Sequence, residues 1–154
     1  MELANLLTPE CIEANLKVTS KKQALQEISK RIADATNKNE RDIFDVITER
    51  EKLGTTGVGD GIAIPHGKLE TLEKLYGFFA RLEKPINFDS VDERPVDLIF
   101  LLLAPESAGA EHLKALACVS RFLRDNKNCD KLRGSNNPEA LYALLIGNEN
   151  YQAA

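Results

Sequence analysis

The segment from Val96 to Ala104 constrains the fold of this chain more than any other feature of its sequence. Apolar residues fill the segment almost completely, and only Asp97 interrupts them. The run is far shorter than the roughly 20 residues that a membrane-spanning helix needs. Within it, Leu98–Leu103 has the unbroken apolar character of a strand covered on both faces. The sequence therefore predicts a buried central strand here.

Helices are predicted on either side of this strand in the sequence, and their starts carry capping signals. Ser20, with Gln23 three positions later, forms a capping box, and Asn39 is a good N-cap. Asn137 is an N-cap that places a proline at the first helical position, and Gly147 is expected near the end of that helix. The predicted helices are Lys21–Thr36, Glu40–Glu51, Ala110–Arg124 and Pro138 to about Gly147.

The remaining segments are predicted to be strands, turns and one glycine-rich loop. Thr8–Glu10 indicates a turn or a short helical turn, Asp130–Arg133 a short turn, and the tail up to Ala154 a frayed end. Helices and strands in this order predict one layered α/β domain with a mixed sheet, which spans residues 1–154. The other predicted strands are Ala14–Val18 at an edge, Ile62–Ile64 before Pro65, and Tyr76–Leu82.

Charge and cysteine usage exclude several classes of function. The net charge of -4 and the pI near 5.3 argue against nucleic-acid binding, which needs a basic face. Cys11, Cys118 and Cys129 form no C-x-x-C pair and no metal-ligand spacing, and their odd number argues against a disulfide framework. The first residues show no basic region followed by an apolar one, so no signal peptide is expected. These features predict a cytoplasmic protein without membrane insertion.

The segment Gly54–Gly61 contains four glycines and invites a comparison with nucleotide-binding loops. Gly54 and Gly59 have the spacing of a Walker A motif, but Asp60 and Gly61 stand where the lysine and the hydroxyl residue belong. A Rossmann fingerprint also fails, because the segment leads from a helix into a strand. Two interpretations stay open: a flexible connector, or a loop whose accessible amides form an anion-binding concavity.

His66 and His112 are the two histidines of the chain, and a lone histidine is usually structural. His66 stands apart because it follows a short apolar strand and Pro65 and precedes Gly67, which favours a rigidly presented imidazole. Two histidines make a poor metal site, and no G-x-S-x-G elbow supports a hydrolase triad. A nucleophilic His66 that accepts phosphate is therefore the most economical interpretation, with no metal or cofactor expected.

A long signature then resembles a known family. Residues 48–68, which read TEREKLGTTGVGDGIAIPHGK, are similar to the active-site signature of bacterial phosphotransferase-system enzyme IIA proteins of the fructose–mannitol type. Within that family the chain most resembles the stand-alone nitrogen-regulatory enzyme IIA. Further matches are Pro85–Asp89, Pro95–Leu98 and Glu111–Leu116, so the resemblance covers nearly the whole chain. It implies a three-layer fold with a mixed β-sheet between helices.

The resemblance also implies roles for individual residues. His66 would receive phosphate on Nε2 from a histidine-containing phosphocarrier protein, in a relay that starts at phosphoenolpyruvate and passes through enzyme I. His112 would be a second active-site histidine and Arg50 an active-site cation. Thr56 and Gly57 would lie on the phosphate loop, together with Asp60, where relatives carry an acidic residue or an amide.

Simpler explanations exist for the residues around His66. Arg50 suits the negative end of its helix dipole, Thr56 suits a turn, and His112 suits a helix surface. The resemblance favours active-site roles instead.

The resemblance leaves two biological roles open. In the first, the phosphorylation state of His66 is a regulatory signal of nitrogen and carbon status that target proteins read; in relatives these targets include potassium-transport components and sensor kinases. In the second, the chain is a sugar-specific enzyme IIA that passes phosphate to an enzyme IIB. A third interpretation, a binding module that never carries phosphate, fits poorly with the intact signature.

Overall fold

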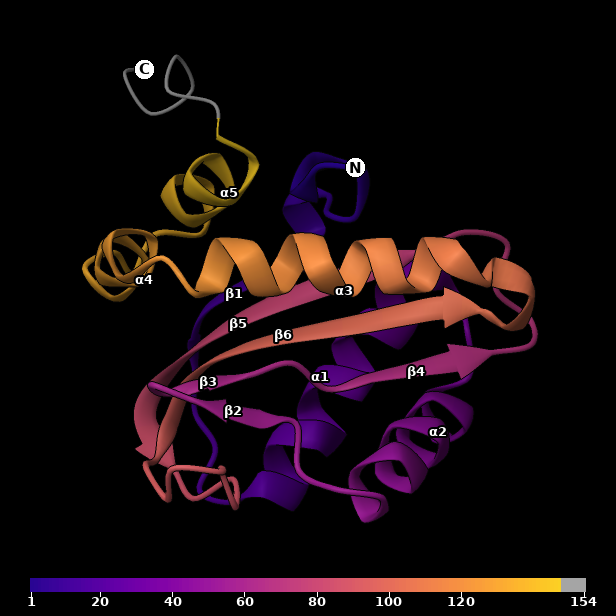
Figure 1. The fold of residues 1–154 in the computed structure, drawn as a ribbon, viewed down its shortest axis with the longest axis horizontal. Coiled ribbons are helices and arrows are strands. Elements are labelled where there is room, and N and C mark those ends of the chain that lie inside the picture. The colour runs from indigo at the N-terminus through magenta and orange to yellow at the C-terminus, as the bar shows by residue number, and fades with distance from the viewer. Residues whose placement is uncertain (148–154) are drawn as a thin grey trace.

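A six-stranded mixed sheet forms the middle layer of the computed structural model, which describes residues 1–147 (Figure 1). The tail that was predicted to fray, up to Ala154, lies outside the described residues. Strand β6 is central, as the apolar run predicts, and it has more neighbours than any other described strand. The strands are β1 Ile12–Leu16, β2 Gly57–Gly59, β3 Ile62–Ala63, β4 His66–Leu69, β5 Tyr76–Ile86 and β6 Val96–Pro105.

The connections around β6 place two short strands end to end along one of its sides. On one side β5 runs antiparallel to β6, and β1 lies beyond it as a parallel edge strand. On the other side β3 and then β4 pair with β6 in parallel, with Ile62 opposite Leu98 and His66 opposite Leu102. Strand β2 pairs antiparallel with β3 and forms the second edge. The segment Ile62–Leu69 thereby runs alongside β6 from Leu98 to Pro105.

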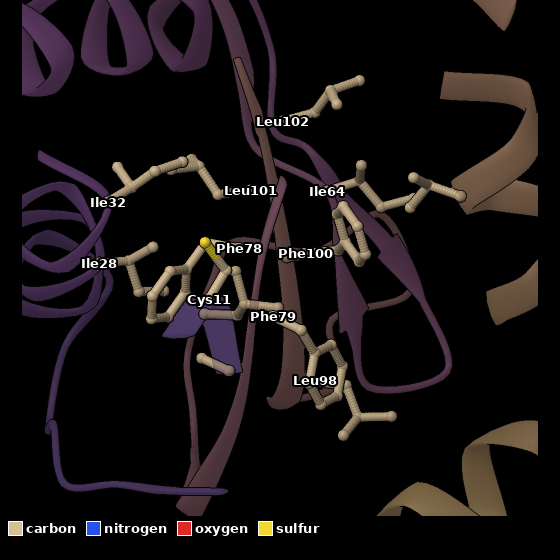
Figure 2. Packing of buried hydrophobic residues seen from close by; sticks show 14 of the residues in the cluster. Cys11, Ile28, Ile32, Ile64, Phe78, Phe79, Leu98, Phe100, Leu101 and Leu102 are labelled. Atoms are coloured by element: carbon tan, nitrogen blue, oxygen red, sulfur yellow. The ribbon is translucent and has the colours of Figure 1, made fainter. Parts of the chain in front are cut away.

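Alternating side chains of β5 and β6 build the core on both faces of the sheet. Phe78 and Leu101 are register partners and lie on the face that α1 covers, where Ile28 and Ile32 also point (Figure 2). Phe79 and Phe100 are partners on the opposite face (Figure 2). Each of these two cross-strand pairs removes large apolar surfaces from water, which is the main driving force for the packing.

Helices cover both faces, which confirms the three-layer α/β fold. Helices α1 and α2 lie on one face and α3 on the other (Figure 1). Ser20 Oγ accepts the Gln23 amide at 3.1 Å, as the capping box predicts, although the Gln23 side chain reaches back to Thr19 instead of Ser20. The helices are α1 Lys21–Thr36, α2 Glu40–Lys52, α3 Ala110–Leu123, α4 Asn126–Arg133 and α5 Pro138–Ile146, with 3-10 turns at Leu3–Asn5, Pro9–Cys11 and Glu106–Ala108.

Three segments differ from the sequence prediction. Asp130–Arg133 is not a short turn but the second half of α4, which Asp125 caps by accepting the Lys127 amide. Strands β2 and β4 occur where a loop and a single histidine corner were expected, because β3 and β6 offer hydrogen-bonding edges to them. Strand β1 begins two residues before the predicted Ala14 and ends at Leu16.

Among residues 1–147, no helix has the length and apolar character that crossing a membrane requires.

Candidate functional site

His66 is held by backbone contacts on both sides of it. It is the first residue of β4, and the preceding carbonyl of Pro65 accepts the Leu102 amide of β6 at 2.9 Å. The following residue, Gly67, lies directly beneath α2, where a Cβ atom would stand 3.2 Å from Val46 Cγ2. Glycine at this position therefore lets α2 approach the histidine closely. The rigid presentation of the imidazole that the sequence predicts is present in the structure.

The ring of His66 has a defined proton arrangement. Its Nδ1 lies 2.9 Å from the carbonyl oxygen of Ile64, which can only accept a hydrogen bond. Its Nε2 lies 3.2 Å from Nε of Arg50, which can only donate one. Both contacts require the neutral tautomer with the proton on Nδ1. The lone pair of Nε2 is consequently the nucleophilic site of the ring.

Arg50 approaches His66 from the last turn of α2. Its Nη1 group also donates to the carbonyl of Gly54 at 2.9 Å, which holds the guanidinium between the helix end and the ring. The position in the last turn agrees with the helix-dipole explanation, and the contact with Nε2 agrees with the active-site explanation. The structure therefore brings Arg50 and His66 together.

His112 lies in the first turn of α3 and is only 8% exposed, which contradicts the simple surface-residue interpretation. Its ring centroid is 5.6 Å from that of His66, and the two rings are tilted by 53°. Its Nδ1 is buried and has no hydrogen-bond partner among the described residues. A buried polar atom without a partner carries a free-energy penalty, and such atoms are often found at functional sites.

Both histidines are kept neutral near pH 7. Burial is the main cause that lowers the pKa of His66 below 6.5, and the charge of Arg50 lowers it further, whereas the Ile64 hydrogen bond and Glu51 oppose the shift. Burial also lowers the pKa of His112, with smaller contributions from His66 and Lys68. A neutral imidazole retains the lone pair that a nucleophile needs.

An open pocket of about 540 Å³ surrounds the two rings. Lys68, two residues after His66 on β4, joins Arg50 as a second cation on its wall, and the exposed side chain of Leu53 forms part of its rim. The sequence did not single out Lys68, although its place two residues after His66 in a strand would have put both side chains on one face. The pocket is lined by Asp45, Val46, Glu49, Arg50, Leu53, His66, Gly67, Lys68 and His112.

Thr56 and Gly57 are buried and do not line this pocket. The amide of Thr56 donates to both carboxylate oxygens of Glu51 at 3.1 Å, and its hydroxyl donates to the same carboxylate. Gly57 packs against Ser90, whose Oγ would lie 2.5 Å from a Cβ atom. Both residues have partners within the protein, which differs from the phosphate contacts that the resemblance implies.

Asp60 lies still further from the histidines. It occupies the turn between β2 and β3, beside Asp97 of β6. Asp97 lies five positions before Leu102, the partner of His66, which is roughly 16 Å along the strand. Its amide donates to Asp92 at 2.9 Å and its carbonyl accepts from Arg133 at 2.8 Å. The structure thus places Asp60 outside the pocket and gives it a role in the turn.

The described residues contain no cluster of three or more side chains that could hold a metal ion. What the pocket does contain is one oriented nucleophile, two cations, a second neutral histidine and the acidic residues Asp45 and Glu49. This combination suits an incoming phosphoryl group, because phosphoryl transfer depends on positioning and on donors for the charged oxygens.

Comparisons with known proteins agree with this chemistry. Residues 5–148 match the family described as phosphoenolpyruvate-dependent sugar phosphotransferase system, EIIA 2. The chain is 58% identical over 145 residues to the nitrogen regulatory protein of Bradyrhizobium diazoefficiens, covering 94% of this chain and 95% of that protein. It is 42% identical over 151 residues to that of Escherichia coli, covering 97% and 92%. The crystal structure of nitrogen regulatory protein IIA-Ntr from Neisseria meningitidis superposes with a TM-score of 0.87 at 34% identity, covering 93% and 98%.

Proposed function

The chain belongs to the EIIA 2 family of the phosphoenolpyruvate-dependent sugar phosphotransferase system. We propose that this protein is a phosphocarrier and that His66 is the residue that carries the phosphoryl group. The proposed donor is a histidine-containing phosphocarrier protein. One observation supports the choice of His66 above all others: the Ile64 carbonyl holds the ring proton on Nδ1 and leaves the Nε2 lone pair at an open pocket. The protein then acts as a phosphotransferase component with a phosphohistidine intermediate.

The transfer step follows from the positions of the side chains. Nε2 of His66 attacks the phosphorus atom as the bond between phosphorus and the donor's nitrogen breaks, and that nitrogen keeps the electron pair of the broken bond. The ring of His66 becomes cationic, and its Nδ1–H bond to Ile64 strengthens because charged donors bind more tightly. Arg50 leaves the lone pair and donates to a phosphoryl oxygen, while Lys68 and His112 face the added charge from the other walls.

Phosphorylation would also change what the pocket presents to other proteins. Before the reaction, the pocket wall carries the cations Arg50 and Lys68, the acidic residues Asp45 and Glu49, and two neutral rings. A phosphoryl group adds about 1.5 to 2 negative charges at pH 7, so a pocket with balanced charges becomes negative and attracts a basic partner. Relatives named nitrogen regulatory protein support the interpretation that this change of charge is a regulatory signal. The proposed targets are potassium-transport components or sensor kinases.

One experiment tests the acceptor. The protein is incubated with labelled phosphoenolpyruvate, enzyme I and the carrier protein, alongside the His66→Ala and His112→Ala variants. We expect acid-labile, base-stable label on the wild type, none on His66→Ala, and slower labelling of His112→Ala. An unlabelled wild type with an active donor chain would refute the phosphocarrier function. Rapid transfer of the label to an added enzyme IIB would favour sugar transport over regulation.

A further inference from the structure

Glu51 follows Arg50 directly on α2, yet it does not line the pocket and its side chain is only 6% exposed. Its carboxylate accepts the amide and the hydroxyl of Thr56 and forms an ion pair with Lys21 of α1 at 3.1 Å. Burying a carboxylate is costly unless it is paired and hydrogen-bonded, and here every contact helps to hold it in one place. Glu51 is therefore a fixed negative charge just behind the reacting site.

A continuous line of hydrogen bonds leads from this carboxylate to the imidazole. Glu51 accepts hydrogen bonds from the amide and the hydroxyl of Thr56. The carbonyl oxygen of Thr56 accepts a hydrogen bond from the amide of Ile64 at 3.0 Å. The carbonyl of Ile64 in turn accepts the Nδ1 proton of His66 at 2.9 Å. Each of these hydrogen bonds fixes the backbone that makes the next one, so the carboxylate helps to hold the Ile64 carbonyl in place against the ring.

We infer that Glu51 is a positioning residue for phosphoryl transfer, acting through Thr56 and the Ile64 carbonyl to hold the Nδ1-protonated tautomer of His66. The inference rests on the proposed function, since it concerns how the proposed acceptor is prepared. Glu51 touches none of the reacting atoms. Its effect reaches the ring through the backbone of two other residues.

The charge of Glu51 suits the step as well as its geometry does. His66 begins neutral and becomes cationic when Nε2 bonds to phosphorus, so a nearby carboxylate stabilises the product state more than the starting state. Arg50 has the opposite effect on the ring but offsets the charge of the phosphoryl oxygens. The opposite directions in which Arg50 and Glu51 move the pKa of His66 reflect this division.

The test compares Glu51→Gln with a matched control, Glu13→Gln. Glu13 is also a part-buried glutamate in an ion pair, to Arg31 at 2.6 Å, but it lies on the edge strand β1 and contacts no residue of the pocket. Nitrogen-15 NMR of the imidazole reports the tautomer and the pKa of His66 without any phosphate present. Labelling from the carrier protein reports the rate of transfer.

For Glu51→Gln we expect a His66 pKa below that of the wild type, a growing share of the Nε2-protonated tautomer, and transfer slowed on the order of tenfold, the scale typical of losing a partner that orients an imidazole. The concentration of carrier protein that gives half the maximal transfer rate should not change. The Glu13→Gln variant should match the wild type in all of these measurements. A Glu51→Gln protein with the tautomer ratio and pKa of the control would overturn the inference.

A second variant keeps the test decisive if Glu51→Gln does not fold. Thr56→Val removes the hydroxyl but keeps the hydrogen bond from the backbone amide of residue 56 to Glu51. Thr56→Ser keeps both the amide and a hydroxyl. We expect Thr56→Val to shift the tautomer ratio in the same direction by a smaller amount, and Thr56→Ser to recover it. Unchanged spectra in Thr56→Val would count against the relay. Because the spectra need no phosphate, they separate a failure of this inference from a failure of His66 to accept phosphate.

Discussion

The two ends of β6 hold polar side chains in opposite states. At the Val96 end, Arg133 donates from Nε to both oxygens of Asp97, and from Nη2 to Asp97 and to the carbonyl of Asp60, all within 3.1 Å. At the Leu102 end, Nδ1 of His112 is buried without a partner, and Arg50 donates to a nitrogen that must be vacated for reaction. Arg133 and Asp97 at one end are fully paired, whereas the buried ring nitrogen at the other end is not.

This difference fits the proposed function, in which one end of the sheet contributes stability and the other chemistry. Satisfied charged groups at the first end fix the β2–β3 turn against α4 and leave nothing to offer a ligand. Unsatisfied groups at the second end reduce the stability of the folded state, because a buried donor or acceptor without a partner loses its hydration. His112 also lines the pocket in which the proposed phosphoryl group would bind. Substitutions at the two ends should therefore change different measurements.

The largest expected effect belongs to Arg50→Gln at the reacting end. Loss of a charged donor aimed at the phosphoryl oxygens should slow transfer from the carrier protein roughly a hundredfold. The pKa of His66 should rise, because Arg50 lowers it in the wild type. Transfer rates and an NMR titration measure the two effects. Lys52, an exposed residue on the same helix turn, provides the control variant Lys52→Gln. Equal transfer rates for the two variants would show that Arg50 has no part in transfer.

His112→Leu sharpens the comparison by separating function from stability. The apolar side chain removes the unpaired Nδ1, so we expect the free energy of unfolding to stay level or to rise by up to about 1 kcal/mol. Transfer should slow about tenfold, because the pocket loses the imidazole that lies beside the ring of His66. His112→Gln, which keeps an amide donor, should recover part of the rate. A stable, fully active His112→Leu protein would show that this ring has no part in transfer.

At the opposite end, Arg133→Met should reduce stability and leave transfer unchanged. The ion pair with Asp97 is part-buried, and its loss would leave that carboxylate with fewer donors, at a cost of about 1–2 kcal/mol in the free energy of unfolding. Thermal unfolding and the labelling assay measure the two quantities. Arg31→Met, which breaks single hydrogen-bonded ion pairs to Glu13 and Glu27 in place of a bidentate one, should cost less. A slower transfer in Arg133→Met would contradict the independence of the two ends.

The sequence predicted most of the elements that depend on local signals. Capping at Ser20, Asn39 and Asn137 fixed the starts of three helices, because an N-cap acts within three residues. The apolar run from Val96 to Ala104 predicted the central strand because it too is a local signal, contained within the strand itself. Strand β4 was missed because it exists only through pairing with the distant β6, whereas β2 was missed although it pairs with the neighbouring β3 across the Asp60–Gly61 turn.

The site was predictable to the same extent. His66 could be chosen from its neighbours along the chain, whereas the placing of His112 against it depends on the packing of α3 over the sheet. Asp97 appeared in the sequence only as an interruption of an apolar run, and its partner Arg133 is 36 residues away, in a helix predicted to be a turn. The tie between Glu51 and Thr56 likewise needed the structure, because no periodic pattern links a helix end to the loop that follows.

The smallest expected effect is that of Asp60→Asn, and it probes the boundary between the two ends most directly. Asp60 adopts a left-handed backbone with φ of 57°, which asparagine tolerates equally well. Its hydrogen bonds to Asp92 and Arg133 use backbone atoms that the substitution keeps. Its side chain has only a 3.7 Å contact with Arg94, exposed on both sides, which is worth little. We expect stability within about 0.5 kcal/mol of the wild type and an unchanged transfer rate. In Asp60→Ala the strained backbone should cost about 1 kcal/mol, again without slowing transfer. If instead both variants slow transfer, Asp60 takes part in phosphate binding as the family resemblance implies, and the separation of a structural end from a reacting end fails at this turn.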